Sequence, residues 1–188
     1  MIRLLDFFFS LFGLILISPF ILILLIIVYF ETGSPIFMQI RIGQNEKKIK
    51  IFKFRTMYKN TLSMPTHLND LNSVTPFGSF LRSFKLDEIP QLWNVLRGDM
   101  SLVGPRPCLP NQYYLINERR ARGVFSVKPG ITGLAQISSI DMSTPKKLAK
   151  IDADMIRNFN IKSYFKYILL TILGKGNGDK VKRKKETK

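Results

Sequence analysis

Residues 7 to 30 read FFFSLFGLILISPFILILLIIVYF, and this stretch decides to which broad class of fold the chain belongs. It carries no charged residue and is long enough to cross the hydrocarbon core of a bilayer. A secretory signal peptide would be shorter and would end in small residues, whereas this stretch ends in Tyr29-Phe30 and runs into Glu31. We therefore expect a retained membrane segment over residues 1–32.

The pair Ser18-Pro19 near the middle of this segment bears on its path through the membrane. Proline removes a backbone hydrogen bond and disfavours helix at the preceding residue, while the Ser18 hydroxyl is suited to bind a freed carbonyl. Positive charge lies on both sides of the segment, with Arg3 before it and Arg41 after it, so the positive-inside bias selects no orientation. A re-entrant hairpin that returns to the cytoplasmic face and a kinked single span are equally favoured on these grounds.

The composition limits the size of the protein and the chemistry of its partners. A chain of 188 residues fits one domain, and a net charge of +16 with a pI of about 10.1 favours anionic partners. Nucleic acid, an anionic membrane surface and phosphorylated substrates all satisfy this condition. The basic segment 175–188, which ends in DKVKRKKETK, is too charged to pack and is expected to be a disordered tail drawn to anionic lipid headgroups.

Cysteine and histidine each occur only once, which excludes several kinds of site. Cys108 is the single cysteine, so the chain forms no internal disulfide, and we interpret it as a small filler of a Pro-rich loop rather than a catalytic thiol. His67 is the single histidine, which argues against a histidine metal cluster or a histidine-bearing triad.

A β-hairpin is expected after the membrane segment. PIFMQIRIG at 35–43 and KKIKIFKFRTM at 47–57 both alternate apolar and polar residues, and a Gly-Gln-Asn-Glu turn joins them. A slip of the alternation at Ile51-Phe52 predicts a bulge. The basic residues of the hairpin, which include Lys53, are interpreted as a solvated face. The polar residues from 60 to 73 are expected to form a loop.

Thr75-Pro76 and Thr144-Pro145 each predict the start of a helix, because proline is favoured at the first helical position after a capping residue. The first of these helices carries an apolar stripe made of Phe77, Phe80, Leu81 and Phe84. This stripe is compatible with a place in the core and equally with an in-plane helix at the membrane interface. The segment YFKYILLTIL at 164–173 raises the same two possibilities.

An acidic pair, Asp87-Glu88, lies just before the helix that contains Trp93 and that Gly98 ends. In one interpretation Asp87 is the N-cap of that helix and Glu88 is favoured in its first turn by the helix dipole. Taken alone, the pair favours this interpretation, although a carboxylate at a helix start can also be a metal ligand or a nucleophile.

The neighbourhood of the acidic pair favours chemistry. A loop with glycines, prolines and Arg106 follows within twenty residues, and VKPGITGLAQ at 127–136 adds Lys128 in a second stiff loop. Glycine lets backbone N–H groups approach a phosphate and arginine binds its oxygens in a fork. The two loops beside Asp87 and Glu88 predict a phosphate site with Mg²⁺.

A third carboxylate occupies an unusual position. In the helix that begins at Thr144-Pro145, the apolar stripe consists of Leu148, Ile151, Met155 and Phe159. At roughly 100° per residue, Asp152 falls in the middle of this stripe while Asp154 faces away. A carboxylate there is costly unless paired. A structural salt bridge to an arginine of the 97–106 loop and a direct contact with substrate are equally favoured.

The sequence resembles the monotopic phosphoglycosyl transferases, a family of bacterial sugar transferases. The matching residues are TPFGSFLRSFKLDEIPQLWNVLRGDMSLVGPRP (75–107), KPGITGLAQIS (128–138), the KFRTM strand end (53–57) and the hydrophobic segment with Ser18-Pro19. Together these motifs span nearly the whole chain, and the block from 86 to 107 is long enough to make chance similarity very improbable.

The resemblance implies a reaction and a set of roles. Family members transfer phospho-sugar from a UDP-sugar to polyprenyl phosphate, giving polyprenyl diphosphate-sugar and UMP. It implies that Asp87 is the nucleophile that forms a covalent phosphosugar intermediate, with Glu88 as a metal or proton-handling partner and Mg²⁺ at the diphosphate. Arg82 and Arg106 become phosphate-contacting candidates, and Asp152 matches a family aspartate near the site.

The resemblance also implies an architecture and a location. The fold is expected to be α+β and mainly α-helical, with a re-entrant helix-break-helix over 1–32, a catalytic domain over 33–174 with a short hairpin and interfacial helices, and the tail 175–188. The protein is expected on the cytoplasmic face of the bacterial inner membrane as a monotopic protein of the family's small form. Its expected partners are a UDP-sugar, polyprenyl phosphate and the anionic membrane surface, and no nucleic acid.

The chain departs from the family pattern after Gly-Leu-Ala-Gln. Many relatives continue with an Asn-Gly-Arg-like turn, whereas this chain has ISSIDMSTP at 137–145. Specificity therefore does not carry over from those relatives, and the sequence leaves open which sugar is transferred, which glycan pathway is served and which oligomeric state is adopted.

Overall fold

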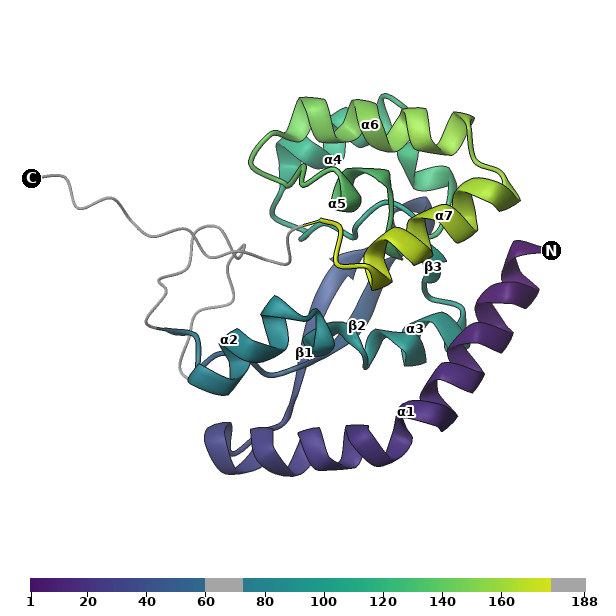
Figure 1. Cartoon of the computed structure of the whole chain (residues 1–188). Helices are drawn as coiled ribbons and strands as arrows, with labels where there is room; N and C mark the ends of the chain where they lie inside the picture. The colour runs from purple at the N-terminus through teal and green to yellow at the C-terminus, as the bar shows by residue number, and fades with distance from the viewer. Residues whose placement is uncertain (60–72, 177–188) are drawn as a thin grey trace, which may run out of the picture.

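The computed structural model describes residues 1–59 and 73–176. Its helices and strands confirm a mainly α-helical α+β fold, seen in Figure 1. In chain order the elements are α1 (Ile2–Thr32), β1 (Ile36–Ile42), η1 (Gln44–Glu46), β2 (Lys48–Phe54), α2 (Pro76–Ser83), η4 (Leu86–Glu88), α3 (Gln91–Arg97), β3 (Ser101–Val103), α4 (Tyr113–Arg120), η5 (Val124–Ser126), β4 (Gly130–Thr132), α5 (Leu134–Ile137), α6 (Pro145–Arg157) and α7 (Ile161–Ile172).

Helix α1 is apolar and bent near its middle, as Figure 1 shows. It is the helix of the described chain that is long and apolar enough to cross a membrane, and only 11 % of its most apolar window is buried by the rest of the chain. Pro19 lies inside it, and the Ser18 hydroxyl donates to the Ile15 carbonyl at 2.8 Å. The predicted interruption at Ser18-Pro19 is thus a bend in a continuous helix, and its return to the same membrane face stays a prediction.

The three charged residues of α1 all bind the globular part of the chain. Asp6 is 2 % exposed and accepts hydrogen bonds from the Tyr164 hydroxyl, the Ser101 hydroxyl and the Leu102 N–H, at 3.0, 3.1 and 3.0 Å. Burial, together with the Asp6 carboxylate, raises the pKa of the Tyr164 hydroxyl, which therefore keeps the proton that it donates. This carboxylate attaches the start of α1 to β3 and α7.

The other two charged residues of α1 cap neighbouring helices. Arg3 donates to the carbonyls of Val95 and Leu96 at the end of α3, the latter at 2.8 Å. Glu31 accepts from the Phe77 N–H at 3.0 Å, in the first turn of α2, where backbone N–H groups have no partner within the helix itself. Both ends of α1 are therefore bound to one body.

The β1–β2 hairpin is antiparallel, as predicted, but it has no bulge. Its register is continuous from Ile36 opposite Phe54 to Ile42 opposite Lys48. The apolar residues that interrupt the alternation serve opposite faces of the hairpin, because Ile51 packs with α3 while Phe54 packs with α1 and α2. The prediction of a bulge at Ile51-Phe52 was wrong because both faces are partly covered.

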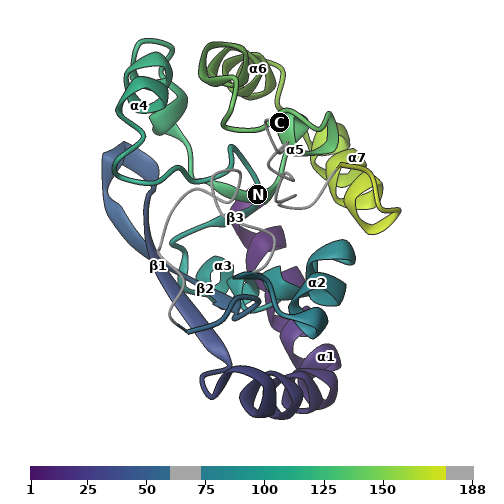
Figure 2. The same ribbon diagram turned by 90° about the vertical axis from the view of Figure 1, so that its left-hand side faces the viewer.

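A second, parallel sheet pairs β3 with β4, which the sequence did not predict. Two glycines allow its backbones to approach, since a Cβ on Gly130 would lie 2.0 Å from the Gly104 nitrogen. Figure 2 shows α4 and α6 at one end of the molecule and α1 and α2 at the other, with the hairpin along one side. The loop after β3 runs between these two groups.

The predicted helix starts at Thr75-Pro76 and Thr144-Pro145 are confirmed by α2 and α6. The apolar stripe of α2 divides between two environments, since Leu81 is fully buried while Phe80 and Phe84 are 48 % and 65 % exposed. Most of the predicted loop at 60–73 and of the tail at 175–188 lies outside the described residues.

Candidate active site

The acidic pair occupies the one-turn helix η4 between α2 and α3. Lys85 before it adopts a left-handed conformation with φ of 58°, which turns the chain sharply into Asp87 and Glu88. Asp87 is 6 % exposed. Helix α3 starts only at Gln91, with Pro90 as its N-cap residue. The interpretation of Asp87 as the N-cap was therefore wrong, because a separate 3-10 turn precedes the helix.

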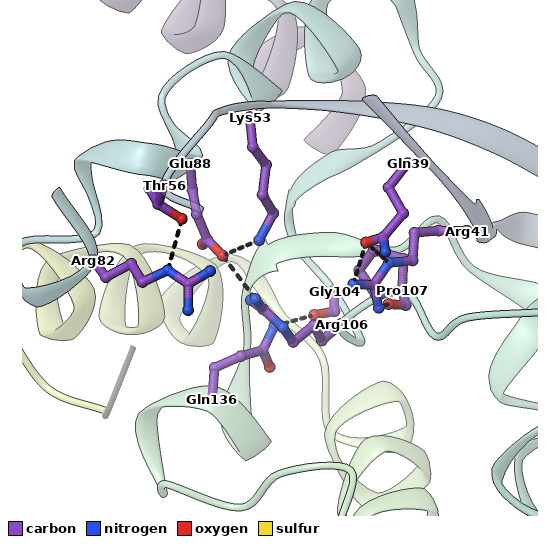
Figure 3. A network of polar contacts seen from close by, with 10 residues as sticks. All are labelled: Gln39, Arg41, Lys53, Thr56, Arg82, Glu88, Gly104, Arg106, Pro107 and Gln136. Carbon is purple, nitrogen blue, oxygen red and sulfur yellow. Dashed lines mark hydrogen bonds and ion pairs between the residues drawn. The ribbon is translucent and has the colours of Figure 1, made fainter. Parts of the chain in front are cut away.

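Glu88 brings together two cations from distant parts of the chain. Its Oε1 accepts from the Lys53 Nζ at 2.9 Å and from the Arg106 Nη2 at 2.8 Å, as Figure 3 shows. The side chains of Glu88, Lys53 and Arg106 are only 13 %, 11 % and 22 % exposed. Because attraction between charges strengthens away from water, this cluster is strongly held. It also concentrates positive charge beside Asp87.

Arg82 of α2 contributes a third cation, with one of its donors unused. Its Nε donates to the Thr56 hydroxyl at 2.7 Å, and its guanidinium points toward Glu88 in Figure 3. The buried Nη1 has no hydrogen-bond partner among the described residues. An unpaired buried donor is rare in folded proteins and is suited to an anionic ligand.

The loop that carries Arg106 is fixed from two sides. Arg41 of β1 donates to the Pro107 carbonyl at 3.1 Å, while Gln39 accepts from Arg41. Arg119 of α4 donates to the Arg106 carbonyl at 2.8 Å. These contacts hold the backbone of the loop in place before any ligand binds.

Asp152 forms the salt bridge expected of a carboxylate on an apolar stripe, but with a different partner. Its Oδ2 accepts from Arg119 at 3.0 and 2.7 Å, and both side chains are 1 % exposed. The predicted partner, an arginine of the 97–106 loop, was wrong, although Arg119 binds the Arg106 carbonyl. A direct contact of Asp152 with substrate stays a prediction.

Lys128 lies apart from the acidic pair. A Cβ built on Gly98 would lie 3.5 Å from the Lys128 Nζ and 3.1 Å from the Arg3 Nη2, so both cations lie near the C-terminal end of α3. Asp87 and Glu88 precede the opposite end of that helix. A phosphate-binding role for Lys128 stays a prediction without geometric support.

Lys53 and Lys85 are site residues that the sequence analysis missed. The alternation of β2 suggested a solvated basic face, which is correct for the exposed Lys50 but wrong for Lys53. Lys85 donates to the Lys175 carbonyl at 2.7 Å, and burial lowers the pKa of its amine. The position of Lys85 directly before Leu86-Asp87-Glu88 could have indicated that it belongs to the site. No feature of the local sequence distinguishes Lys53 from Lys50.

Cys108 is fully buried and free of any disulfide, which confirms its interpretation as a filler of the Pro-rich loop. Burial raises the pKa of its thiol, so the thiolate needed for nucleophilic chemistry is disfavoured.

The donor set at the acidic pair fits a metal that the substrate helps to hold. No group of three or more acidic, histidine or cysteine side chains suited to a metal occurs within residues 1–59 and 73–176. Mg²⁺ in phosphoryl-transfer sites is commonly bound by one or two carboxylates together with substrate phosphates. Asp87 and Glu88 supply that number.

A known protein family and individual proteins resemble this chain over most of its length. The model of a family described as "Bacterial sugar transferase" matches residues 1–175. The chain is 39 % identical over 171 residues to the Bacillus subtilis protein named "Uncharacterized sugar transferase EpsL", covering 90 % of this chain and 84 % of that protein.

Two further relatives are much longer than this chain. The protein of Klebsiella pneumoniae named "UDP-glucose:undecaprenyl-phosphate glucose-1-phosphate transferase" is 43 % identical over 172 residues, covering 85 % of this chain and 36 % of that protein. "Galactosyl transferase CpsE" of Streptococcus agalactiae is 37 % identical over 156 residues, covering 76 % of this chain and 34 % of that protein. The chain thus spans about a third of these two relatives.

Proposed function

This chain belongs to the bacterial sugar transferase family, and we propose that it transfers sugar-1-phosphate from a UDP-sugar to polyprenyl phosphate and releases UMP. Relatives named for transfer of glucose-1-phosphate to undecaprenyl phosphate support the choice of substrates. The observation that carries the proposal is Glu88, next to the buried Asp87, which holds Lys53 and Arg106 while Arg82 points toward it in Figure 3.

The cations suit a diphosphate. Arg106 and Lys53 already share one carboxylate oxygen, and the unpaired Nη1 of Arg82 is a further donor. Donors that are fixed before the substrate binds need no reorganisation as charge develops in the transition state. We assign to these three side chains the binding of the diphosphate oxygens.

The proposed chemistry has two displacement steps. An oxygen of the Asp87 carboxylate attacks the β-phosphorus of the UDP-sugar, the bond from that phosphorus to the bridging oxygen breaks, and UMP leaves. A phosphate oxygen of polyprenyl phosphate then attacks the same phosphorus, and the Asp87 carboxylate is released as the polyprenyl diphosphate-sugar forms. Covalent catalysis of this kind divides one difficult transfer into two easier ones.

Glu88 is assigned the positioning of Lys53 and Arg106, since both cations bind its Oε1. Mg²⁺ would be held by Asp87 and Glu88 with the diphosphate oxygens. When bound, the ion would offset the negative charge of the diphosphate beside the carboxylates.

The same proposal includes a monotopic attachment to the cytoplasmic face of the inner membrane. Arg3 and Asp6 near the start of α1 and Glu31 near its end all bind the same body, which a straight span would hold on opposite sides of the bilayer. The exposed Phe80 and Phe84 of α2 and Leu169 of α7 support an interfacial position of these helices.

The test is nucleotide release by the full chain in lipid discs with Mg²⁺, polyprenyl phosphate and a panel that includes UDP-glucose, UDP-galactose and N-acetylated UDP-hexosamines. We expect UMP from one of these sugars, and its loss with EDTA and in Asp87→Asn. Cys108→Ser is the matched control, because this buried thiol plays no part in the proposed steps, and it should retain turnover.

Release of UDP in place of UMP would contradict the proposal and identify a transferase that moves the sugar alone. Full turnover by Asp87→Asn would contradict the proposed covalent step at Asp87. The melting temperatures of the wild-type chain and both variants should be measured and should agree, so that unfolding is not mistaken for lost chemistry.

A further inference from the structure

Buried polar atoms without partners are candidates for contact with a ligand or an ordered water, because nearly all buried polar groups in native proteins are hydrogen-bonded. Within residues 1–59 and 73–176, four buried side-chain atoms lack a partner: Arg82 Nη1, Gln91 Nε2, Gln136 Oε1 and Asp152 Oδ1. Arg82 and Gln136 both belong to the polar network of Figure 3. Of these two, Gln136 has no role in the proposed mechanism.

Among the described residues, the Gln136 side chain makes one weak hydrogen bond at the edge of the site. Its Nε2 donates to the Gly104 carbonyl at 3.5 Å, the outer limit of a hydrogen bond. Gly104 lies two residues before Arg106, and Figure 3 shows the Gln136 side chain pointing toward the Arg106 guanidinium. The Gly104 carbonyl also orients the amide, since the reverse orientation would set two acceptors against each other.

The unpaired oxygen lies close to a glycine. A Cβ on Gly133 would lie 3.0 Å from the Gln136 Oε1, which is tighter than nine in ten real contacts of that kind. A side chain at the residue that precedes α5 would therefore displace this acceptor. The acceptor is buried from water yet faces no donor of the described chain.

We propose that Gln136 contacts the donor substrate and that its Oε1 accepts a hydrogen bond from a hydroxyl or N–H group of the UDP-sugar. The partner is not a phosphate oxygen, because ionised phosphate oxygens accept hydrogen bonds and do not donate them. Polyprenyl phosphate has a hydrocarbon tail and a phosphate, so it offers no donor of this kind. The donor therefore belongs to the sugar or to the uridine, and this inference rests on the proposed function.

The experiment compares wild type with Gln136→Met, which keeps the length of the side chain and removes the acceptor. It measures KM for the UDP-sugar, KM for polyprenyl phosphate and the inhibition constant of UMP, in lipid discs with Mg²⁺. Gln44→Met is the matched control, since Gln44 lies in the turn of the hairpin and donates to the Ser126 carbonyl. If Gln136→Met does not fold, Gln136→Asn withdraws the acceptor by one methylene and serves in its place.

We expect KM for the UDP-sugar to rise about tenfold, the size of one neutral hydrogen bond, with KM for polyprenyl phosphate unchanged. An unchanged inhibition constant for UMP would locate the donor on the sugar, and a parallel rise would locate it on the uridine. A KM for the UDP-sugar within twofold of wild type would overturn the inference, as would an equal rise for both substrates with a lowered melting temperature. A wild-type chain that releases no UMP would instead contradict the proposed function. UMP release by wild type is therefore measured before any variant is tested.

Discussion

Glu88 Oε1 is a single atom at which three distant segments meet, since it accepts from Lys53 of β2 and from Arg106 of the loop after β3 while belonging to η4. Two cations share one carboxylate oxygen there, so Glu88 fixes their positions relative to each other. Both cations are of the kind that binds the oxygens of a diphosphate.

We predict that Glu88→Gln separates binding from turnover. The neutral amide leaves the positive charges of Lys53 and Arg106 less compensated, so UMP should bind at least as tightly as to wild type. Turnover should fall about 100-fold or more, because pre-oriented donors commonly contribute that much to a rate. Titration of UMP and the rate of UMP release from a UDP-sugar measure the two effects. Loss of UMP binding in step with turnover would show that Glu88 only maintains the fold.

Residues close together in the chain were the ones that the sequence located well. Asp87, Glu88 and Arg106 lie within twenty positions, and their types indicated phosphate chemistry, whereas Arg82 was identified only through the family resemblance. Lys53 was missed because its burial depends on α3 and η4 packing over the hairpin, which strand alternation does not encode. The placement of a residue such as Lys128 depends on loop paths that only tertiary structure fixes.

At the scale of elements, α4 and α6 are joined by one buried ion pair, Asp152 with Arg119. Arg119 also holds the Arg106 carbonyl, so the pair lies directly behind the loop that carries Arg106. Its position on an apolar stripe was predictable from helical periodicity, but its partner was not, because no local pattern pairs α4 with α6.

We predict that Asp152→Leu destabilises the protein by about 3 kcal/mol or more, since it leaves the Arg119 charge buried without a partner. The double variant with Arg119→Leu should lose less than the sum of the two single losses, because no uncompensated charge remains. Thermal unfolding of the four proteins measures this coupling. If Asp152 contacts substrate directly, as the sequence predicted, the double variant would recover stability and still show a raised KM for the UDP-sugar, and an unchanged KM would contradict that contact.

The turn after α7 offers a second test at this scale, because two glycines there share a backbone conformation but differ in their surroundings. Gly174 and Gly176 have φ of 79° and 81°, so alanine is strained equally at both, by roughly 1 kcal/mol. A Cβ on Gly174 meets nothing within 4 Å, whereas one on Gly176 would lie 2.2 Å from the Gln136 carbonyl oxygen.

We therefore predict that Gly176→Ala displaces Gln136 and raises KM for the UDP-sugar several-fold, while Gly174→Ala leaves KM unchanged. Steady-state kinetics on both variants, with melting temperatures alongside, measure the difference. Equal effects of the two substitutions would mean that the contact with Gln136 does not reach the substrate and that only the backbone strain matters.

At the scale of the whole molecule, the membrane segment and the globular part form one structure. Leu24 and Val28 pack with Phe54 and Leu81, and Ile2 and Leu5 pack against the cluster that contains Tyr164. Contacts at both ends of α1 fix the bend of the helix against the body. The sequence predicted an apolar segment with a break at Pro19, but the choice between a hairpin and a kinked span depends on these tertiary contacts.

We predict that both ends of α1 are reached by a membrane-impermeant maleimide from the cytoplasmic side only. The experiment starts from Cys108→Ser and adds single cysteines: one in a short extension before Met1, one at the exposed Lys47, and one at Leu16, which is 81 % exposed in the middle of α1. The first two should label in inverted vesicles and not in intact spheroplasts, because Arg3, Asp6 and Glu31 bind the same body. Leu16→Cys should label in neither preparation, because lipid covers that surface. Labelling of the extension from the periplasmic side would establish a single span, and the contacts of Arg3 and Asp6 would then have to break for the chain to cross.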